Sequence, residues 1–582
     1  MIILFAGAFF RIVFLCTIPY NEAPDEHTHF LSVLFISDNY AIPVLGKDKD
    51  LYRDDLNRKN ITYAGIPGGA YLVPAILVNV ARTFNFEPMN LYVFARLGSL
   101  LFGMLTVVFA SIMGKKIIGK KASLFIALIL SLWPQMIFLS AYINNDAYTI
   151  FVVLFTMYCA HELFTSEKRN IKYLFLSSFA SGLVVMGKAT GLPILFIVMI
   201  VFISHLHTYC SKKQMISILP LMVCIFLVSG GWWIIHNMFH YGVGDPFGTR
   251  ITFNLYKEIE PSSQNLKVMG YSPLWFFSLK SLSWWSDLAK SFFAQFGWRA
   301  INLPVQFYLG FYFFSTLYLF LSFLPPYNFH ANQTFIIMSA FFLLGVNIVL
   351  CAYYSWSVHY QPQGKYLMNS MVLILLSIGI RNHIFDLQPY KNIFMIINYG
   401  FLIFILLSVS FSTLTLIDEY SGFRKLTKYE VYPKQLLPGY PKYFIEVSTY
   451  KEITFYSPKN LLTGICFFYS YKGKDPAAVE VTLRSATNHK LLLKVPVNIY
   501  TTNILKPYII TFKPLTHSQN KSFILDIRPL DQSRKELFGL QLDPGRAETS
   551  FITTPSNKPK KPLLKLLYPK PLLNEHDHLR PL

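Results

Sequence analysis

The sequence has few charged residues. Only 14% of its 582 residues are Asp, Glu, Lys or Arg, whereas 53% are hydrophobic and the mean hydropathy is +0.39. Soluble globular proteins carry roughly a quarter of charged residues, and a bilayer is crossed by roughly 20 mostly apolar residues. Many stretches of that kind are present. The composition therefore excludes a large soluble protein and predicts a polytopic membrane protein.

Cysteine and acidic residues are also scarce. The six cysteines show no spacing typical of a disulfide framework or a zinc site. The N-terminus lacks the basic region and the small-residue cleavage site of a signal peptide, so we expect its apolar stretch to be a retained span. The net charge of +21 would suggest nucleic acid in a soluble protein. Here much of it lies in short loops and the tail beside anionic lipid, so we predict the bilayer, and no nucleic acid, as a partner.

We predict about eleven transmembrane helices. The basic loops 114–121, 166–172, 211–214 and 381–391 fall on one side if the spans alternate, and the positive-inside rule makes that side cytoplasmic. Residues 69–81 are too short for a span, and we expect them to be re-entrant or interfacial. The predicted spans are residues 1–18, 91–113, 122–143, 148–163, 174–187, 192–206, 216–235, 303–324, 335–354, 366–380 and 393–416.

The opposite side of the membrane receives two large outer loops, residues 20–90 and 237–302, and everything after residue 417. From there, short aromatic or β-branched segments separated by Pro, Asn, Gly and Lys predict an all-β sandwich. The predicted organisation is an all-α membrane domain over 1–416, an extracytoplasmic all-β domain over 417–552 and a basic, Pro-rich extended tail over 553–582.

Adjacent acidic residues, Asp25 and Glu26, follow the first span in the segment Pro-Asp-Glu-His-Thr-His-Phe. Acidic residues contribute little to topology, so a pair at a membrane surface suggests general-base work or metal ligation. The alternative interpretation is a helix cap, in which Asp25 opens a helix through His29 and Glu26 lies in its first turn. Local sequence favours neither interpretation over the other.

Four further polar residues fall on the same predicted face. Asn145 and Asp146, preceded by Asn144, lie at the outer end of the third span, where the alternative interpretation of the three residues is a plain turn. Lys188 lies in a tight turn between two spans, and Lys365 enters the tenth span. Each lysine can bind a lipid-linked phosphate as a point charge, and the alternative for both is snorkelling to the interface.

These segments resemble, in order along the chain, the motifs of a family of predicted bacterial membrane glycosyltransferases of the GT-C superfamily. The segment at Asp25 is similar to the family signature PDEPAHF, with His27 and Thr28 in place of Pro and Ala. His236 and Lys365 stand where the family commonly has Arg. The other matching segments are Tyr63 through Pro74, Asn145-Asp146, Gly182-Leu183 with Lys188, Trp232 through Pro246, Ser291 through Trp298, Gln363 through Tyr366 and the C-terminal β region.

The resemblance implies a GT-C-like fold and an inverting glycosyltransferase of the bacterial inner membrane. Its donor would be a polyprenyl-phosphate-linked sugar, and its acceptor a glycan, lipid or protein outside the cytoplasm. No cofactor is predicted with certainty, and a divalent metal ion stays open. The implied roles are catalysis for Asp25 and Glu26, positioning of the acceptor or a metal for Asp146, Asn145 and His29, and donor phosphate binding for Lys188, Lys365 and Tyr366.

Two other functions stay open. A polytopic transporter or flippase of lipid-linked or envelope substrates would have inverted repeats and ionisable groups near the bilayer midplane, whereas the candidate groups here gather at one face. A noncatalytic envelope-assembly protein would use the β domain as its binding module, and Asp25 and Glu26 would then be dispensable.

Overall fold

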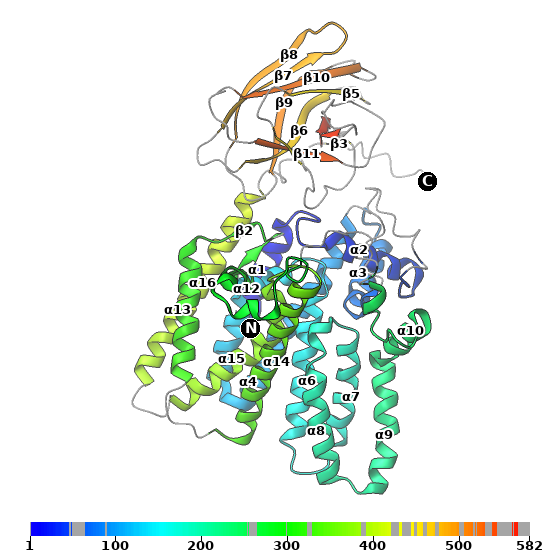
Figure 1. The fold of residues 1–582 in the computed structure, drawn as a ribbon, viewed down its shortest axis with the longest axis vertical. Coiled ribbons are helices and arrows are strands. Elements are labelled where there is room, and N and C mark those ends of the chain that lie inside the picture. The colour runs from blue at the N-terminus through cyan, green and yellow to red at the C-terminus, as the bar shows by residue number, and fades with distance from the viewer. Residues whose placement is uncertain are drawn as a thin grey trace. The chain divides into compact units, whose positions relative to one another are not determined.

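A computed structural model gives the fold. It describes residues 2–45, 48, 65–87, 90–252, 254, 265–297, 299–322, 329–385, 391–420, 430–432, 444–446, 451–457, 462–471, 477–499, 506–515, 518, 521–529, 538–543, 561–562 and 564–568. The chain divides into two compact units, residues 1–18 with 23–414 and residues 19–22 with 415–582. The first unit is helical and the second consists mainly of β-strands, which confirms the predicted fold class (Figure 1).

Within the described residues, six helices are long and apolar enough to cross a membrane, and five shorter helices are also apolar. Together they cover the predicted spans, so the chain is a multi-pass membrane protein. The helices are α1 (Ile2–Thr17), α2 (Glu26–Asn39), α3 (Gly69–Thr83), α4 (Leu91–Leu132), α5 (Pro134–Leu139), α6 (Asp146–Phe164), α7 (Ile171–Val185), α8 (Ile194–Tyr209), α9 (Lys212–Phe226), α10 (Trp232–Tyr241), α12 (Leu282–Phe293), α13 (Val305–Ser322), α14 (Ala331–Ser357), α15 (Met368–Phe385) and α16 (Lys391–Glu419).

Helix α4 covers two predicted spans. Gly119, inside the predicted basic loop 114–121, has φ 82° and ψ 172°, so the element is two helices joined at that glycine. The second of them ends at Leu132, because Pro134 follows and the residue before a proline is disfavoured in the helical region. The predicted span 122–143 is therefore wrong as a continuous helix. It consists of the end of α4, the short α5 and a turn that leads to Asp146.

Helix α4 is also the packing centre of the elements that carry the candidate residues. It contacts α1, α3, α6 and α15, and α2 packs on α3. Residues 69–81, expected to be re-entrant or interfacial, belong to helix α3. The amide of Gly69 donates to the carbonyl of Met186 (3.2 Å), which fastens the start of α3 to the turn before Lys188.

Short 3₁₀ and π turns connect several helices. The π turn η5 (Leu227–Gly231) crosses α7 where glycines face each other: a Cβ on Gly182 would overlap Ser229 and Phe226, and one on Gly230 would overlap the carbonyl of Gly182. This close approach gives the Gly182 position of the matching segment, and Gly230 opposite it, a packing reason. The 3₁₀ turns are η4 (Ala189–Gly191), η6 (Pro273–Phe277), η7 (Leu279–Ser281) and η8 (Gly364–Leu367).

The first unit also contains a small antiparallel pair, β1 with β2, in which Gln295 pairs with Asn302. In the second unit, one sheet has the order β5-β10-β7-β8. The other follows β12-β11-β6-β13-β3, with β4 pairing β11 and β9 pairing β6. The strands are β1 (Gln295–Phe296), β2 (Ile301–Asn302), β3 (Glu430–Tyr432), β4 (Phe444–Glu446), β5 (Lys451–Ser457), β6 (Leu462–Tyr471), β7 (Ala477–Ser485), β8 (Leu491–Ile499), β9 (Lys506–Leu515), β10 (Lys521–Pro529), β11 (Phe538–Asp543), β12 (Lys561–Pro562) and β13 (Leu564–Tyr568).

The core of the second unit follows the alternation of its strands. Val481, Leu483, Leu525 and Ile527 are fully buried on the paired strands β7 and β10. Two further strands, β12 and β13, fall within the stretch expected to be an extended tail, and β13 pairs with β6 and β3. Part of that stretch is thus sheet in the structure.

Candidate active site

Asp25 precedes helix α2 in an unusual backbone conformation. Its φ of 60° and ψ of 11° lie in the left-handed region, and its side chain makes no capping hydrogen bond. The helix of the cap interpretation is thus present, with Asp25 at its N-cap position and Glu26 in its first turn, but the Asp25 side chain does not cap it. The half-buried carboxylate has no hydrogen bond or ion pair within the described part of the chain. Left-handed backbone at a residue other than glycine costs on the order of 1–3 kcal/mol and is concentrated at functional sites.

Glu26, the next residue, is fully committed to an arginine. Its two carboxylate oxygens accept from Nε and Nη2 of Arg96, at 2.6 and 2.7 Å. The same guanidinium donates to the carbonyls of Leu15 (2.8 Å) and Ile18 (2.7 Å) at the end of α1. Both charged side chains are fully buried. Arg96 thus ties together α1, α2 and α4 through the residue that follows Asp25.

Sequence reasoning missed Arg96, although a signal was present. It is an isolated arginine inside a predicted span, and an ionisable residue in such a place marks a functional or structural site by default. Its partner was not predictable, because Glu26 lies 70 positions away in the sequence and their pairing depends on how the helices pack.

The turn before α6 is built by Asn144. Its Nδ2 donates to the carbonyls of Leu139 and Tyr142, and its Oδ1 accepts from the amides of Asp146 and Ala147. The amide of Ile143 donates to Glu26 (3.3 Å), so this turn also rests on the buried ion pair. The plain-turn interpretation therefore holds for Asn144 and leaves the Asp146 carboxylate available.

Asn145 and Asp146 differ in what they contribute. The carbonyl of Asn145 accepts from the amide and hydroxyl of Thr149, and its side chain makes no hydrogen bond among the residues that the structure describes. The Asp146 carboxylate accepts from Nζ of Lys188 at 2.7 Å. Lys188 also lies over the ring of Tyr366, 4.6 Å from its centroid. Snorkelling does not describe this lysine, because its ammonium is turned inward to a carboxylate and an aromatic face.

The electrostatics of the Lys188 turn reflect its burial. Burial lowers the pKa of Lys188, Asp146 opposes this shift, and the charges of Lys365 and Asp25 also act on the ammonium. These interactions place Asp25, Asp146 and Lys365 within electrostatic reach of Lys188, although the four residues come from separate parts of the sequence.

His29 lies on the buried side of α2, one turn after Asp25. Its Nδ1 is 2.7 Å from the hydroxyl of Tyr71 on α3. Burial lowers the pKa of His29 to about 3; Asp146 raises it, and Lys365 and Lys188 lower it. The imidazole is therefore neutral at pH 7 and acts as a hydrogen-bonding group rather than a charge.

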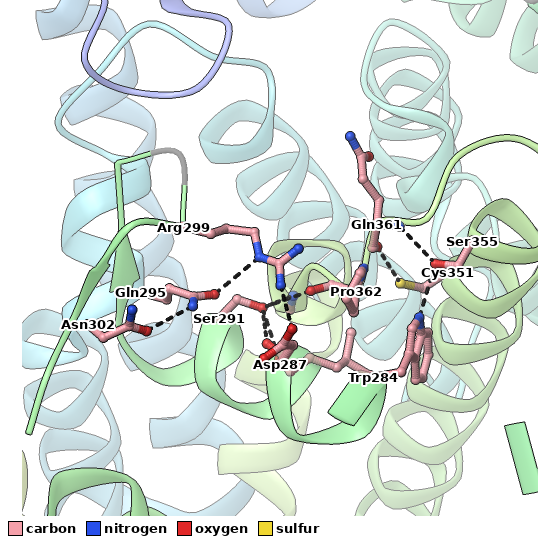
Figure 2. A network of polar contacts seen from close by, with 12 residues as sticks. Trp284, Asp287, Ser291, Gln295, Arg299, Asn302, Cys351, Ser355, Gln361 and Pro362 are labelled. Atoms are coloured by element: carbon pink, nitrogen blue, oxygen red, sulfur yellow. Dashed lines mark hydrogen bonds and ion pairs between the residues drawn. The ribbon is translucent and has the colours of Figure 1, made fainter. Parts of the chain in front are cut away.

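Lys365 belongs to a loop that α12 holds in place, as Figure 2 shows for the surrounding network. The amide of Gly364 donates to Oγ of Ser291 (2.6 Å). A Cβ on Gly364 would overlap the backbone of Phe292, so only glycine allows this approach. The Lys365 ammonium has no hydrogen bond or ion pair within the described ranges and lies 5.8 Å from the ring centroid of Tyr366.

A second polar cluster in Figure 2 joins α12 to the β1–β2 pair. Arg299, with φ 66°, donates to Asp287 (2.9 Å) and to Gln295 (3.3 Å), and Gln295 donates to Asn302 (2.9 Å). The hydroxyl of Tyr366 donates to Oε1 of Gln361 at 2.8 Å. Residues Tyr63 and Trp298 of the matching segments lie outside the described residues.

The structure thus brings the predicted site residues together and divides their roles. In the part of the chain that the structure describes, the Asp25 carboxylate and the Lys365 ammonium have no hydrogen bond or ion pair, whereas Lys188 binds Asp146 beside Tyr366. A carboxylate of this kind can accept a proton, and two ammonium groups can bind an anion such as phosphate. Among the described residues, no group of three or more His, Cys, Asp or Glu side chains is arranged to hold a metal ion.

Comparisons with known proteins agree with the resemblance found in the sequence. Residues 76–241 match the family model of dolichyl-phosphate-mannose-protein mannosyltransferases, which confirms the resemblance to GT-C enzymes. This range contains Arg96, Asp146 and Lys188. No curated protein sequence matches the chain.

Two solved structures are similar in part. ArnT from Cupriavidus metallidurans, bound to undecaprenyl phosphate, has 14% identity and a TM-score of 0.38, with 66% of this chain and 59% of that chain covered. The oligosaccharyltransferase AglB from Archaeoglobus fulgidus, in complex with an inhibitory peptide and a dolichol-phosphate, has 11% identity and a TM-score of 0.36, with 72% and 55% covered. The chain thus spans somewhat more than half the length of each.

Proposed function

We propose that this multi-pass membrane protein is a GT-C-type glycosyltransferase. It transfers a sugar from a polyprenyl-phosphate-linked donor to an acceptor outside the cytoplasm. The observation that carries the proposal is the Lys188–Asp146 pair beside Tyr366, with the charges of Asp25 and Lys365 both acting on the Lys188 ammonium, in a helical domain of which residues 76–241 match the mannosyltransferase family. The family name specifies a dolichyl-phosphate-linked mannose, so a lipid-phosphate donor is the substrate class that fits the two lysines.

The reaction follows from the charges of the site. Asp25 accepts the proton of the acceptor hydroxyl as that oxygen attacks the anomeric carbon. The bond between the anomeric carbon and the phosphate oxygen breaks, and the polyprenyl phosphate leaves with the electron pair, so the anomeric configuration inverts. Lys365 and Lys188 stabilise the negative charge that grows on the departing phosphate.

The remaining residues position these groups. Asp146 holds the Lys188 ammonium toward Tyr366, and Tyr366 lies beneath both lysines. His29 and Asn145 line the acceptor side as neutral groups. Glu26, predicted with Asp25 as catalytic, acts instead through Arg96: with both oxygens bound, it holds the strained Asp25 backbone rather than a proton.

We further propose a bacterial inner-membrane location. The catalytic membrane domain covers residues 1–416, and the extracytoplasmic β domain covers 417–552 together with strands β12 and β13 of the basic stretch 553–582. The basic loops support this orientation. Reporter fusions after residue 417 and within residues 114–121 test it. The first should lie outside the cytoplasm and the second inside, and a cytoplasmic C-terminus would refute the proposed orientation.

Consumption of a radiolabelled polyprenyl-phosphate-sugar by membranes tests the function directly. We expect release of polyprenyl phosphate and a labelled product with inverted anomeric configuration, both absent with Asp25→Asn. Unchanged donor that merely moves between leaflets would assign the chain to the transporter class. A donor that is neither consumed nor moved between leaflets would leave the noncatalytic envelope-assembly function as the remaining alternative.

A further inference from the structure

One segment has both buried and strongly exposed apolar side chains. This segment, residues 265–285, contains η6, η7 and the first turn of α12; it is called the η6–η7 segment below. Its inner side is part of the core, where Leu266, Phe276 and Trp284 pack with Leu288, Cys351 and Leu367. The indole of Trp285 and the hydroxyl of Ser281 both donate to the carbonyl of Phe276, which fixes the turn.

The outer side of the η6–η7 segment is uncovered. Leu274, Phe277, Leu279 and Leu282 are 73%, 87%, 85% and 61% exposed. Four large apolar side chains within nine residues at such exposure mark an interaction surface. Because the inner side chains of the segment are packed in the core, the four exposed side chains cannot be buried there as well.

The charge of the η6–η7 segment indicates which class of partner it binds. It contains no Asp or Glu, and its only charged residues are Lys267 and Lys280. Lys280 is exposed beside the apolar side chains, and Lys267 lies over the ring of Trp356 at 5.3 Å. Apolar side chains flanked by lysines and tryptophans are the composition of a membrane interface with anionic lipid.

The position of the segment in the fold agrees with that partner. Its backbone is fastened to the last turn of α14, a helix long and apolar enough to cross a membrane. The amide of Lys267 donates to the carbonyl of Trp356 (2.9 Å), and the indole of Trp356 donates to the carbonyl of Tyr271 (2.8 Å). The end of a span is where the membrane meets water, and tryptophan is enriched there.

We propose that the η6–η7 segment inserts Leu274, Phe277, Leu279 and Leu282 into the leaflet at the end of α14. Its lysines contact the phosphates of anionic lipids in that leaflet. The segment is an interfacial anchor outside the transmembrane helices, and its partner is the bilayer itself rather than a protein.

The anchor is connected to the candidate site by hydrogen bonds. Trp284 donates to Oγ of Ser355 (3.1 Å), and that oxygen also accepts from the amide of Gln361 (3.3 Å). Ser291 of α12 accepts from Gly364, the residue before Lys365. Insertion of the anchor therefore sets the depth of the Lys365 ammonium at the level of the lipid phosphates. This last step rests on the proposed function, whereas membrane insertion does not.

A depth measurement tests insertion without any reaction. A fluorescent amino acid is incorporated at position 279 of the full chain, reconstituted as one copy per nanodisc with anionic lipid. The matched control carries it at position 488, on the exposed β7–β8 turn. We expect brominated acyl chains to quench the probe at 279 and not at 488, and aqueous iodide to do the reverse.

Two results of that experiment would overturn the anchor. Equal iodide quenching at both positions would leave the segment in water. Protection from iodide that requires two copies per disc, without quenching by brominated lipid, would assign the surface to a second copy of the chain.

A kinetic measurement tests the connection to the site. The variant Phe277→Ser with Leu279→Ser is compared with Leu491→Ser, an exposed leucine on β8. We expect the KM for a long-chain polyprenyl donor to rise roughly tenfold in the double variant, from the apolar area withdrawn from lipid. The KM for a short, water-soluble donor and both kcat values should not change.

An unchanged KM for the long-chain donor, or a fall in kcat with both donors, would overturn this connection. A wild-type protein that transfers no sugar would instead refute the proposed function, and the depth measurement would still decide the anchor.

Discussion

Arg96 binds both carboxylate oxygens of Glu26 inside the helical unit, whereas the carboxylate of the preceding residue, Asp25, has no hydrogen bond or ion pair to any residue that the structure describes. The two acidic residues of one motif therefore have different tasks. A buried carboxylate whose two oxygens both accept hydrogen bonds from one guanidinium is not available to a substrate. A half-buried carboxylate on a left-handed backbone is available for a substrate.

The first prediction concerns Asp25→Asn. We expect transfer to fall by ~10²–10⁴-fold, as for the loss of a general base, because the amide cannot accept the acceptor's proton. Stability should not fall, since Asp25 makes no side-chain bond within the described residues whose loss would matter. Initial rates and thermal melting of the purified protein measure both. Transfer within a few-fold of wild type would remove Asp25 as the base.

The second prediction concerns Arg96→Met. It strands Glu26 as a buried, unpaired charge, which should cost about 3–5 kcal/mol of stability. The melting temperature should fall sharply. Replacing both partners, with Glu26→Leu and Arg96→Met together, should recover most of the stability because no buried charge remains. Turnover should stay low in the double variant, since Asp25 loses its support. A single Arg96→Met variant that melts like wild type contradicts the structural role of the pair.

Much of this arrangement was predictable from local sequence. Hydropathy located the helical spans, because length and apolar content are properties of single segments. The change to short β-branched segments located the strands. The resemblance brought Asp25, Asp146, Lys188 and Lys365 into one hypothesis, and in the structure the other three charges all act on the Lys188 ammonium.

The pairing of those residues was not predictable. Whether an ammonium is free or bound depends on which distant carboxylate faces it, and that is a property of tertiary packing. Thus Lys188 binds Asp146 while Lys365 binds no carboxylate among the described residues. The end of α4 was misjudged for a local reason, since hydropathy does not register the break that Pro134 causes. Likewise, strands β12 and β13 were hidden in a stretch whose Lys and Pro content is typical of a tail.

The third prediction concerns pH and His29. Its folded-state pKa of about 3 lies below its ordinary value of 6.5, so between these values the unfolded chain binds a proton that the folded chain excludes. The stability contributed by the neutral imidazole is therefore complete above about pH 6.5 and is lost as the pH falls, by about 2 kcal/mol at pH 5. His29→Gln keeps a partner for Tyr71 and should remove this loss.

Melting temperatures from pH 7 to pH 5 test this prediction. The wild-type curve should fall more steeply than that of His29→Gln. His489→Asn, on the exposed β7–β8 turn, is the control and should run parallel to wild type. Parallel curves for wild type and His29→Gln would mean that protonation of His29 does not destabilise the folded protein, which would contradict the lowered pKa of this buried imidazole.

The last prediction separates phosphate binding from snorkelling at Lys365. Both interpretations put the ammonium at the same boundary, but they differ in what each substitution does. If Lys365 neutralises the leaving phosphate, Lys365→Arg should keep most activity, because Arg also carries the charge and occupies this position in the similar family. Lys365→Met should lose ~10²–10³-fold in kcat.

The loss should appear in turnover rather than in donor binding, because the phosphate gains charge toward the transition state. Lys365 suits this test better than Lys188, whose removal would also leave Asp146 without its cation. If Lys365 only snorkels, Met is tolerated, since an apolar side chain fits the membrane boundary. Initial rates against donor concentration for wild type, Arg and Met variants decide between the two. A Met variant with wild-type kcat and KM would exclude Lys365 from the site and leave Lys188 as its phosphate ligand.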